Sequence, residues 1–371
     1  MKLYVIAGER SGDLHGSNLV KALKGLDASL AIRGFGGDEM HKTGVDIFVH
    51  YERLAFMGFI SLITKTFTIF KYLRLCKNDI LQFKPDAIVL IDYGGFNRVI
   101  AKFAKKKNIR AYYYIPPKVW AWYQSRAFEL QRNVARLFVI LPFEKEFYKK
   151  KCDWDVDYVG NPVLDAIKSF KADPDFLDKN KIDRTKKIVA LLPGSRKMEL
   201  KRIVPLMAEV VEKNPNVQFV VAAVNNLNEK LYHELKNKEQ VKFVCDASYD
   251  LLSVADAAIV TSGTATLETC IFNVPQVVVY KMGWLEYQLV SRLVQVKFIS
   301  LINLIANKEV IKELIQSEAY VDKISKELDL LLTEGRYRST MLHEYGAIFK
   351  TLDRGSASEN TAQLMMEDLK S

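Results

Sequence analysis

Short apolar runs, rich in valine, isoleucine and tyrosine, alternate with longer helical patterns through most of this chain. The first series lies at residues 3–8, 31–37, 86–92, 110–115 and 136–141, and a second at residues 187–194, 218–224, 241–244, 257–263 and 275–280. Because each strand-like run is followed by a stretch long enough for a crossover helix, the pattern predicts parallel sheets with helices on both faces. We therefore expect an α/β protein with two doubly wound domains.

The domain boundary is expected near residue 165. A chain of 371 residues is longer than one hydrophobic core usually supports. Polar residues replace the apolar pattern just beyond residues 160–162, which marks a linker. The predicted domains are residues 1–165 and 166–339. After Tyr280 the strand signal fades, and a C-terminal helix at residues 340–371 is expected to complete the first domain.

The composition narrows the possible partners. The net charge is +10, from 54 Lys and Arg against 44 Asp and Glu, which favours phosphates or acidic lipid headgroups. No nucleic-acid-binding motif appears, so nucleic acid is not expected as a partner. Four scattered cysteines and five histidines lack metal-ligand spacing, so neither a metal nor a cofactor is expected. The N-terminal apolar run is too short for a signal peptide, which predicts a cytoplasmic protein.

Ligands of open parallel sheets bind beyond the carboxyl ends of the strands, so the loops at these positions are candidate sites. The first loop places three glycines four residues apart between a strand and a helix, where backbone can approach a ligand closely. Its candidate binding residues are Gly8, Ser11, Gly12 and Asp13. A tight turn capped by Asp13 is the alternative interpretation.

Two loops of the second series combine glycine with the start of a helix. In the first, Gly194, Ser195 and Arg196 offer backbone N–H groups and a guanidinium, which suit a diphosphate. In the second, Gly263 lets phosphate oxygens reach the helix, while Ser262 or Thr264 can cap it. Glu268 follows about one turn later, where a carboxylate could accept hydrogen bonds from ribose hydroxyls.

Asp92 is the candidate general base, since it directly follows a fully apolar strand. A helix-capping role is the alternative for this residue. Beyond the next strand, residues 112–122 crowd aromatic side chains around two prolines, and these rings suit either a ligand wall or a core.

The segment from residue 56 to residue 77 predicts a helix with a wide apolar face and flanking lysines. Its charges make it a poor transmembrane span. A core-facing helix is one interpretation, and docking on a membrane surface is the other. The candidate docking residues are Phe56, Met57, Phe59, Ile60, Ile63, Phe67 and Phe70.

An ordered set of motifs runs through most of the chain. They are GERSGDLHG at residues 8–16, GFGGDEM at 34–40, AFMGF at 55–59, PDAIVLIDYGGFN at 85–97, PPKVWAW at 116–122, LPFEKEFY at 141–148, ALLPGSRKMEL at 190–200, SGTATLE at 262–268 and FISLINLIANKEVIKELIQ at 298–316. Each motif is weak alone, but the set in this order is specific. The chain resembles the lipid A disaccharide synthase family.

This resemblance implies a GT-B glycosyltransferase, with two Rossmann-like domains facing across a cleft and no metal requirement. The implied donor is UDP-2,3-diacylglucosamine, bound by the C-terminal domain. The implied acceptor is 2,3-diacylglucosamine 1-phosphate, known as lipid X, bound by a membrane-facing N-terminal domain. The product is a β(1→6) disaccharide and UDP leaves, so the anomeric centre inverts. Because both substrates carry acyl chains, the resemblance also implies work at the anionic inner face of the cytoplasmic membrane.

The family roles carry over onto matching residues. Asp92 matches the candidate base, Gly194 to Arg196 match the diphosphate loop, and Glu268 matches the acid of the nucleotide loop. One departure concerns Gly95, where many members of the family have a second aspartate. Asp92 is then the sole acid of its loop in this chain.

Two other classes of protein fit parts of the pattern. One is a different enzyme acting on UDP-N-acetylglucosamine with the same architecture, either a glycosyltransferase or a 2-epimerase. The other is a non-catalytic, nucleotide-binding protein of the membrane surface. The sequence leaves open whether the chain forms a homo-oligomer.

Overall fold

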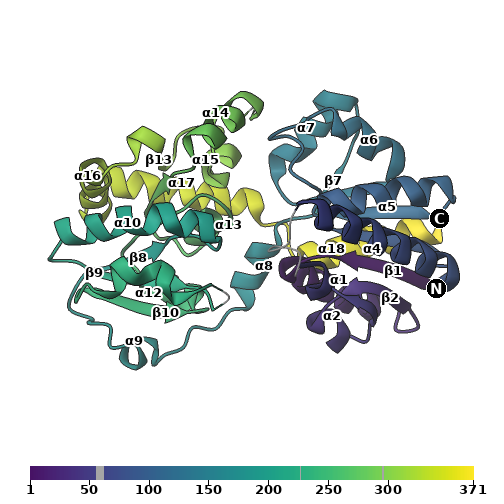
Figure 1. The fold of residues 1–371 in the computed structure, drawn as a ribbon, viewed down its shortest axis with the longest axis horizontal. Helices are drawn as coiled ribbons and strands as arrows, with labels where there is room; N and C mark the ends of the chain where they lie inside the picture. The colour runs from purple at the N-terminus through teal and green to yellow at the C-terminus, as the bar shows by residue number, and fades with distance from the viewer. Residues whose placement is uncertain (56–61, 226, 295) are drawn as a thin grey trace. The chain divides into compact units, whose positions relative to one another are not determined.

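The alternating pattern folds into two parallel sheets, each in its own compact unit (Figure 1). The structure is a computed structural model that describes residues 1–55, 62–225, 227–294 and 296–371. The first unit comprises Met1–Pro162 together with Arg354–Ser371, and the second comprises Val163–Asp353.

The first unit holds a seven-stranded sheet in the order β3-β2-β1-β4-β5-β6-β7. Every paired strand in it is parallel. Its elements are β1 Lys2–Ala7, α1 Arg10–Leu26, β2 Ala31–Gly36, α2 Asp38–Lys42, β3 Asp46–His50, α3 Glu52–Ala55, α4 Leu62–Phe83, β4 Ala87–Ile91, α5 Gly94–Lys106, β5 Arg110–Tyr114, α6 Arg126–Asn133, β6 Arg136–Val139, α7 Pro142–Cys152, β7 Asp157–Tyr158 and α18 Ala357–Lys370.

Alternate residues of β1 point into two different cores of the first unit. Leu3, Val5 and Ala7 pack in the core that includes buried residues of α1 and α18. Tyr4 and Ile6 pack in the core that includes residues of α4 and α5. This is the period of two expected for a strand that is covered on both faces. It explains why the strand-like runs of the sequence are apolar throughout.

The second unit holds a six-stranded parallel sheet in the order β10-β9-β8-β11-β12-β13. Its elements are α8 Pro162–Ser169, α9 Phe176–Lys179, β8 Ile188–Leu192, α10 Lys197–Lys213, β9 Gln218–Ala223, η2 Glu229–Tyr232, α11 His233–Lys236, β10 Val241–Cys245, α12 Ser248–Val254, β11 Ala257–Val260, α13 Thr264–Ile271, β12 Gln276–Tyr280, α14 Trp284–Leu293, α15 Leu301–Ala306, β13 Lys312–Ile315, η3 Gln316–Glu318, α16 Val321–Leu332 and α17 Arg336–Leu352.

The C-terminal part of the chain differs from the prediction in two respects. First, β13 is a strand in the part of the chain after Tyr280, where no further strand was expected; its sequence KELI has two charged residues among four, as suits the edge of a sheet. Second, residues 340–353 belong to the second unit. The side chains of Met341, Tyr345 and Ile348 in α17 are buried, and the hydroxyl of Tyr345 accepts a hydrogen bond from Gln276 of β12 at 3.3 Å.

The last helix alone returns to the first unit. The chain turns at Gly355, whose φ of +79° suits glycine. In α18, Met365 and Met366 are buried against the core beside α1. Asn360 of α18 donates a hydrogen bond to the carbonyl of Val159 at 3.0 Å. The chain therefore passes from the first unit to the second near residue 162, three residues before the predicted boundary. It returns to the first unit near residue 354.

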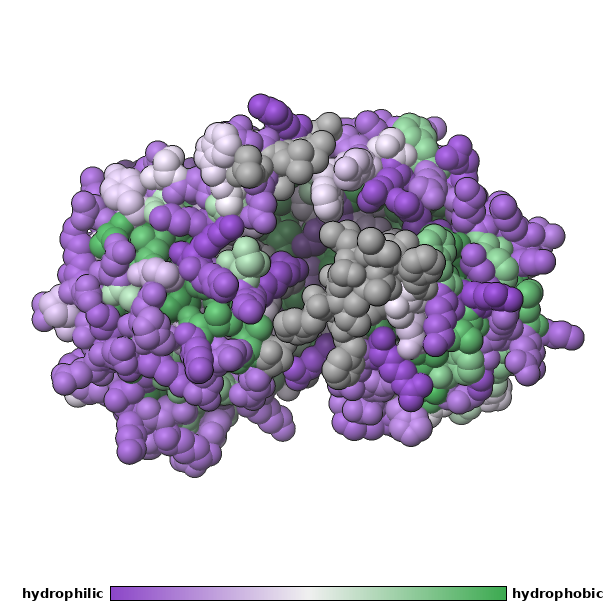
Figure 2. Space-filling view, in the orientation of Figure 1, coloured by the Kyte–Doolittle hydropathy of each residue, from purple (hydrophilic) through white to green (hydrophobic). Residues whose placement is uncertain are grey.

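Hydrophilic residues cover most of the face of the molecule seen in Figure 2. None of the described helices is long and apolar enough to span a membrane. Within the same described residues, no three His, Cys, Asp or Glu side chains are grouped so that they could hold a metal ion.

Candidate active site

The first unit changes its strand order between β1 and β4, and two of the predicted loops meet at this point. Parallel pairing places Ala7 beside Ile91, so the loops that follow these residues leave the sheet side by side. A Cβ atom at Gly8 would lie 2.3 Å from the ring of Tyr93, so only a glycine fits there without displacing that ring. The structure thus brings Gly8 together with the Asp92 segment at the position where open α/β sheets bind ligands.

The backbone at Asp92 is strained and is held by side chains. Asp92 and Tyr93 have φ values of 47° and 48°, in the left-handed region, which costs about 1–3 kcal/mol per residue. The carbonyl oxygen of Asp92 accepts hydrogen bonds from the Asn97 amide at 2.9 Å and from the Tyr113 hydroxyl at 2.8 Å. Asn97 and Tyr113 are fully buried, so they hold the carbonyl in place through two hydrogen bonds that do not involve the carboxylate.

The carboxyl group of Asp92 has a raised pKa. Burial is the main cause, because it removes water from the charged form, while the Tyr93 N–H and the charge of Lys118 partly oppose it. A carboxylate with a raised pKa is a better proton acceptor once it is ionised. The environment of Asp92 therefore suits the predicted base.

The structure changes the interpretation of the first glycine-rich motif. Helix α1 already begins at Arg10, so Ser11, Gly12 and Asp13 lie in its first turn. A Cβ atom at Gly12 would be 3.4 Å from Ala7, in ordinary contact, so this glycine lies against the end of β1. Ser11 is exposed. Apart from Gly8, the motif serves helix–sheet packing, and ligand binding by Ser11 and Gly12 stays a prediction.

Asp13 holds a different helix from the one that contains it. Its buried carboxylate accepts hydrogen bonds from the N–H groups of Gly37 at 2.7 Å, Glu39 at 3.0 Å and Met40 at 3.2 Å. These groups lie at the start of α2, whose N–H groups lack partners within the helix. The side chain of Asp13 is 3% exposed, which leaves little room for a substrate. A structural role accounts for this residue, although not by capping its own turn as the alternative interpretation expected.

The second unit has its own change of strand order, between β8 and β11. The loops that contain Gly194 and Gly263 follow these two strands, and the Thr261 N–H donates to the Leu192 carbonyl at 2.9 Å. The structure therefore brings the two predicted nucleotide loops together at the carboxyl edge of the sheet.

A carboxylate already occupies the amino end of α10. Glu199 accepts hydrogen bonds from the Ser195 and Arg196 N–H groups at 3.2 and 3.3 Å, and it pairs with the Arg196 guanidinium at 3.0 Å. The sequence predicted these N–H groups as free. Gly194, at a φ of +102°, lies against this same carboxylate. Glu199 belongs to α10 itself, and its carboxylate satisfies the N–H groups and the guanidinium that the sequence assigned to a diphosphate.

The amino end of α13 is open in comparison. Gly263 is the N-cap residue, and no described side chain caps this helix, so the prediction of a cap by Ser262 or Thr264 is wrong. The Ser262 hydroxyl instead donates to the Ile299 carbonyl at 3.0 Å. A Cβ atom at Gly263 would meet no described atom within 4 Å. Backbone N–H groups of α13 are thereby left for an anionic ligand.

Glu268 lies one turn into α13 in a partly exposed position. Its pKa is raised because burial disfavours the charged form, and the Tyr249 hydroxyl, 3.5 Å away, partly offsets this. Tyr249 belongs to an aromatic group with Phe170 and Phe272, with ring centroids 5.3 to 5.9 Å apart. The Glu268 carboxylate therefore lies beside an aromatic group. It belongs to α13, the helix whose amino end is open.

Tyr280, at the end of β12, lies near Arg196 and Glu199 of the Gly194 loop, although the sequence motifs did not mark it as a candidate site residue. Tyr280 ends this strand, and its pKa is raised by burial and by the negative charge of Glu199, while Arg196 lowers it. Arg202 of α10 pairs with Glu286 at 3.0 Å in the same region. Tyr280 could have been selected from the sequence because it ends an apolar strand, as the other candidate residues do. In the sheet this strand lies next to β11.

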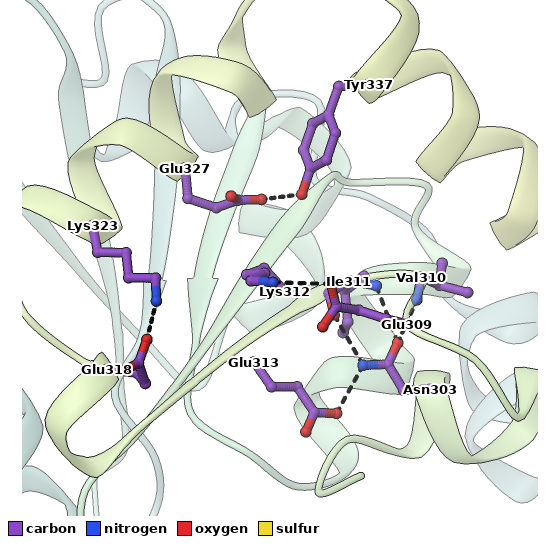
Figure 3. A network of polar contacts seen from close by, with 10 residues as sticks. All are labelled: Asn303, Glu309, Val310, Ile311, Lys312, Glu313, Glu318, Lys323, Glu327 and Tyr337. Atoms are coloured by element: carbon purple, nitrogen blue, oxygen red, sulfur yellow. Dashed lines mark hydrogen bonds and ion pairs between the residues drawn. The ribbon is translucent and has the colours of Figure 1, made fainter. Parts of the chain in front are cut away.

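A polar network around Asn303 and Glu313 contacts the segment that holds the Ser262 side chain. The Asn303 side chain donates to Glu313 at 2.8 Å and accepts from the Val310 and Ile311 N–H groups (Figure 3). Glu313 also accepts from the Ile299 and Ser300 N–H groups at 2.9 and 3.0 Å. Because Ile299 holds Ser262, the network links the edge strand β13 to the nucleotide loop.

We expect Glu313→Gln to lower the free energy of unfolding by about 2 kcal/mol, since an amide cannot accept all of these bonds and leaves a backbone N–H group without a partner. The affinity for UDP should fall with it. Urea unfolding and titration calorimetry check both effects. Glu309→Gln is the matched control, because Glu309 pairs with Lys312 of the same strand region and takes no part in the contacts of Glu313. Equal stability of the two variants would contradict the role of the network.

A buried glutamate fixes the aromatic segment after β5. Trp120 donates its indole N–H to Glu144 at 2.9 Å, and Glu144 also accepts from the Leu141 N–H at 2.9 Å. Burial raises the pKa of Glu144 to about 7, and these hydrogen bonds oppose the rise. Trp120 is thus a core residue, whereas Trp122 is 49% exposed. The position of Glu144, three residues after Leu141, was the available sign of a capping arrangement.

The predicted membrane-docking residues are described only in part. Phe56, Met57, Phe59 and Ile60 lie outside the described residues. Ile63 and Phe67 lie within α4, which extends to Phe83, six residues beyond the predicted end. Phe70 of the same helix is 65% exposed and Ile69 is 39% exposed. Phe70 is thus the predicted docking residue whose side chain the structure describes, and Ile69, which was not among the predicted residues, is exposed beside it in the chain.

Solved structures share the fold of this chain at low sequence identity. The UDP-GlcNAc 2-epimerase from Neisseria meningitidis bound to UDP-GlcNAc has a TM-score of 0.67 and 14% identity, and the match covers 100% of both chains. A glycotransferase of kitacinnamycin has a TM-score of 0.68 and 11% identity, with 99% of both chains covered. The predicted GT-B fold, with two parallel-sheet α/β units, is confirmed.

Sequence relatives cover almost the whole chain. The lipid-A-disaccharide synthase of Geobacter metallireducens is 33% identical over 374 residues, covering 99% of this chain and 97% of the relative. That of Syntrophus aciditrophicus is 35% identical over 373 residues, with 99% and 97% covered. The family model described as lipid-A-disaccharide synthetase matches residues 3–367. The chain belongs to the lipid-A-disaccharide synthetase family.

Proposed function

We propose that this chain transfers a 2,3-diacylglucosaminyl group from UDP-2,3-diacylglucosamine to the 6-hydroxyl group of 2,3-diacylglucosamine 1-phosphate. The products are a β(1→6) disaccharide 1-phosphate and UDP. Family membership along residues 3–367 carries the proposal, and it makes the chain a glycosyltransferase of lipid A biosynthesis. The likeness to 2-epimerases concerns the fold, and it gives no reason to prefer epimerisation.

The chemical step is a single displacement at the anomeric carbon. The acceptor 6-oxygen forms a bond to this carbon while the bond to the β-phosphate oxygen of UDP breaks, and UDP leaves with the electron pair. Asp92 takes the proton of the 6-hydroxyl group. Its raised pKa and its held backbone support this role. Because one displacement occurs, the configuration inverts.

The donor nucleotide is assigned to the second unit. The open amino end of α13 offers N–H groups to the diphosphate, and Arg196 offers a guanidinium that stabilises the leaving charge. Glu199 now holds this guanidinium and two N–H groups. The diphosphate would replace this carboxylate, so Arg196 exchanges one anionic partner for another. Glu268 is the proposed acceptor of ribose hydroxyl bonds.

A membrane surface is the proposed source of both acylated substrates. The net charge of +10 favours an anionic surface. In α4, exposed Lys71 and Arg74 follow exposed Ile69 and Phe70, which combines apolar and cationic side chains at one place. These features support the proposal that the protein works at the inner face of the cytoplasmic membrane.

Phe70→Asp should weaken binding to vesicles of phosphatidylglycerol by about tenfold, because burying an exposed phenylalanine contributes about 1.5–3 kcal/mol. Cosedimentation measures the bound fraction. Leu26→Asp is the control, since Leu26 is 52% exposed at the end of α1 in the same unit. Equal losses in the two variants, or none in Phe70→Asp, would contradict docking through α4.

The reaction is tested by incubating the purified protein in detergent micelles with both substrates, without added metal. Mass spectrometry should find the disaccharide 1-phosphate and UDP in equal amounts. UDP-GlcNAc given alone tests the alternative, because a 2-epimerase converts it to the 2-epimer without releasing UDP. Epimer without disaccharide would overturn the proposed reaction.

A further inference from the structure

A small basic pocket in the first unit adjoins the Asp92 loop. It has a volume of about 180 Å³, and its lining includes Gly94, Gly95, Arg98, Pro117, Trp122 and Arg126. Ligand pockets for whole drug-sized molecules are usually about 300–1,000 Å³, so this one suits a single group such as a phosphate. Its residues come from α5, from the segment after β5 and from α6.

Two arginines from different helices line this pocket. Arg98 of α5 uses its Nε in an ion pair with Glu129 at 3.4 Å, and none of the described residues accepts a hydrogen bond from its two terminal nitrogens. The guanidinium of Arg126 lies 4.5 Å from the ring centroid of Tyr123, which orients it without using a hydrogen bond. Both groups thus keep donors for a ligand, and Arg donors match phosphate oxygens in geometry.

The backbone of α5 adds donors to the same pocket. This helix begins at Gly94, and its N-cap residue Tyr93 makes no side-chain cap. A Cβ atom at Gly95 would meet no described atom within 4 Å, so the backbone here is open to a ligand. The amino end of a helix favours negative charge. The two guanidinium groups and this helix end outweigh the charge of Glu129.

The pocket also lies beside the proposed base. Gly94 follows Asp92 by two residues, and a Cβ atom at Gly94 would lie 2.9 Å from Pro117 of the pocket. Lys118, the next residue, is close enough to lower the pKa of Asp92. In a hexosamine 1-phosphate, the phosphate and the 6-hydroxyl are attached on either side of the ring oxygen. A group that holds this phosphate therefore positions the hydroxyl that reacts.

We infer that this pocket binds the phosphate monoester of the acceptor through Arg98 and Arg126, and so aims the acceptor 6-hydroxyl at Asp92. The inference rests on the proposed function, since that reaction supplies an acceptor with a 1-phosphate. It adds two acceptor-positioning residues to the site, neither of which the sequence motifs had singled out.

The test compares an acceptor that carries the 1-phosphate with one that lacks it. Arg98→Gln and Arg126→Gln should each raise the KM for the phosphorylated acceptor by about tenfold or more, which is about 1.4 kcal/mol of binding. The KM for the donor and the kinetics with the dephosphorylated acceptor should change little. Arg126→Lys keeps the charge and should recover part of the loss. Arg132→Gln, an exposed arginine of the same helix outside this pocket, should behave as the wild type.

A binding measurement separates this inference from the proposed reaction. Glucosamine 1-phosphate is titrated into wild type and both Gln variants by calorimetry, with inorganic phosphate and phosphatidylglycerol vesicles as competitors. Weaker binding in the variants supports the pocket even if the wild type makes no disaccharide. Inorganic phosphate should compete more weakly than glucosamine 1-phosphate binds, since it shares the phosphate group and lacks the sugar. Inorganic phosphate that binds as tightly as glucosamine 1-phosphate identifies a free-anion site, and competition by vesicles alone identifies a lipid-headgroup site; either result overturns the inference. Equal KM increases for both acceptors would also overturn it.

Discussion

Asp92→Asn should lower kcat for disaccharide formation by about 10²–10⁴-fold, the usual contribution of a positioned general base. Asparagine is nearly the same size as aspartate and accepts the left-handed backbone that Asp92 adopts, so the fold should persist. The amide cannot take the proton of the acceptor hydroxyl. The affinity for UDP should stay unchanged, because the nucleotide is assigned to the second unit. Steady-state kinetics and UDP titration measure the two quantities.

Asp86→Asn provides the control for this variant. Asp86 directly precedes β4, at the end of the strand away from Asp92, and it accepts a hydrogen bond from the Lys2 N–H on the surface. Its replacement should leave kcat within about twofold, as expected for surface changes of less than 0.5 kcal/mol. Full activity in Asp92→Asn would show that this carboxylate is not the base.

The dependence of the activity on pH should also report the ionisation of Asp92. The raised pKa of Asp92 means that the base becomes protonated at a higher pH than an ordinary aspartate does. Activity should therefore fall as the pH decreases through this raised value. The residual activity of Asp92→Asn should lack that acidic limb. An unchanged limb in the variant would assign the titration to another group.

Arg196→Gln should lower kcat/KM by about 10²-fold, because a charged donor to the leaving diphosphate is lost. The side chain is 81% exposed and pairs with Glu199, so its removal should alter stability little. The Kd for UDP should rise in parallel. Arg184→Gln is the control, since Arg184 pairs with Asp178 on the surface of the same unit. If the two variants bind UDP equally well, Arg196 does not contact the diphosphate.

The sequence was sufficient to predict the positions of the site loops. An apolar run that is buried on both faces is recognisable as a strand, and the loop after such a strand must leave at the carboxyl edge of a parallel sheet. This is why the sequence could place Asp92, Gly194 and Gly263 in loops at the carboxyl ends of strands, and the structure has these residues after β4, β8 and β11. The strand β13 was missed because half of its four residues are charged and it lies at an edge.

The partners of polar side chains could not be predicted from local patterns. Asp13 bonds to N–H groups 24 to 27 residues away, and these come near only when α1 and α2 pack together. Glu199 lies three residues after Arg196, a spacing typical of a capping box, yet its carboxylate holds the groups that were assigned to a diphosphate. These contacts decide which helix has free N–H groups at its amino end and which helix has a carboxylate bound there.

Hydrogen exchange measured by mass spectrometry with and without UDP tests the position of the nucleotide site most directly. With UDP bound, we expect slower exchange in peptides that contain the amino ends of α10 and α13, residues 194–199 and 263–267. Peptides around Asp92 should not be the main region of protection. If UDP protects the Asp92 loop and leaves both helix ends of the second unit unchanged, the assignment of the nucleotide to the second unit is wrong.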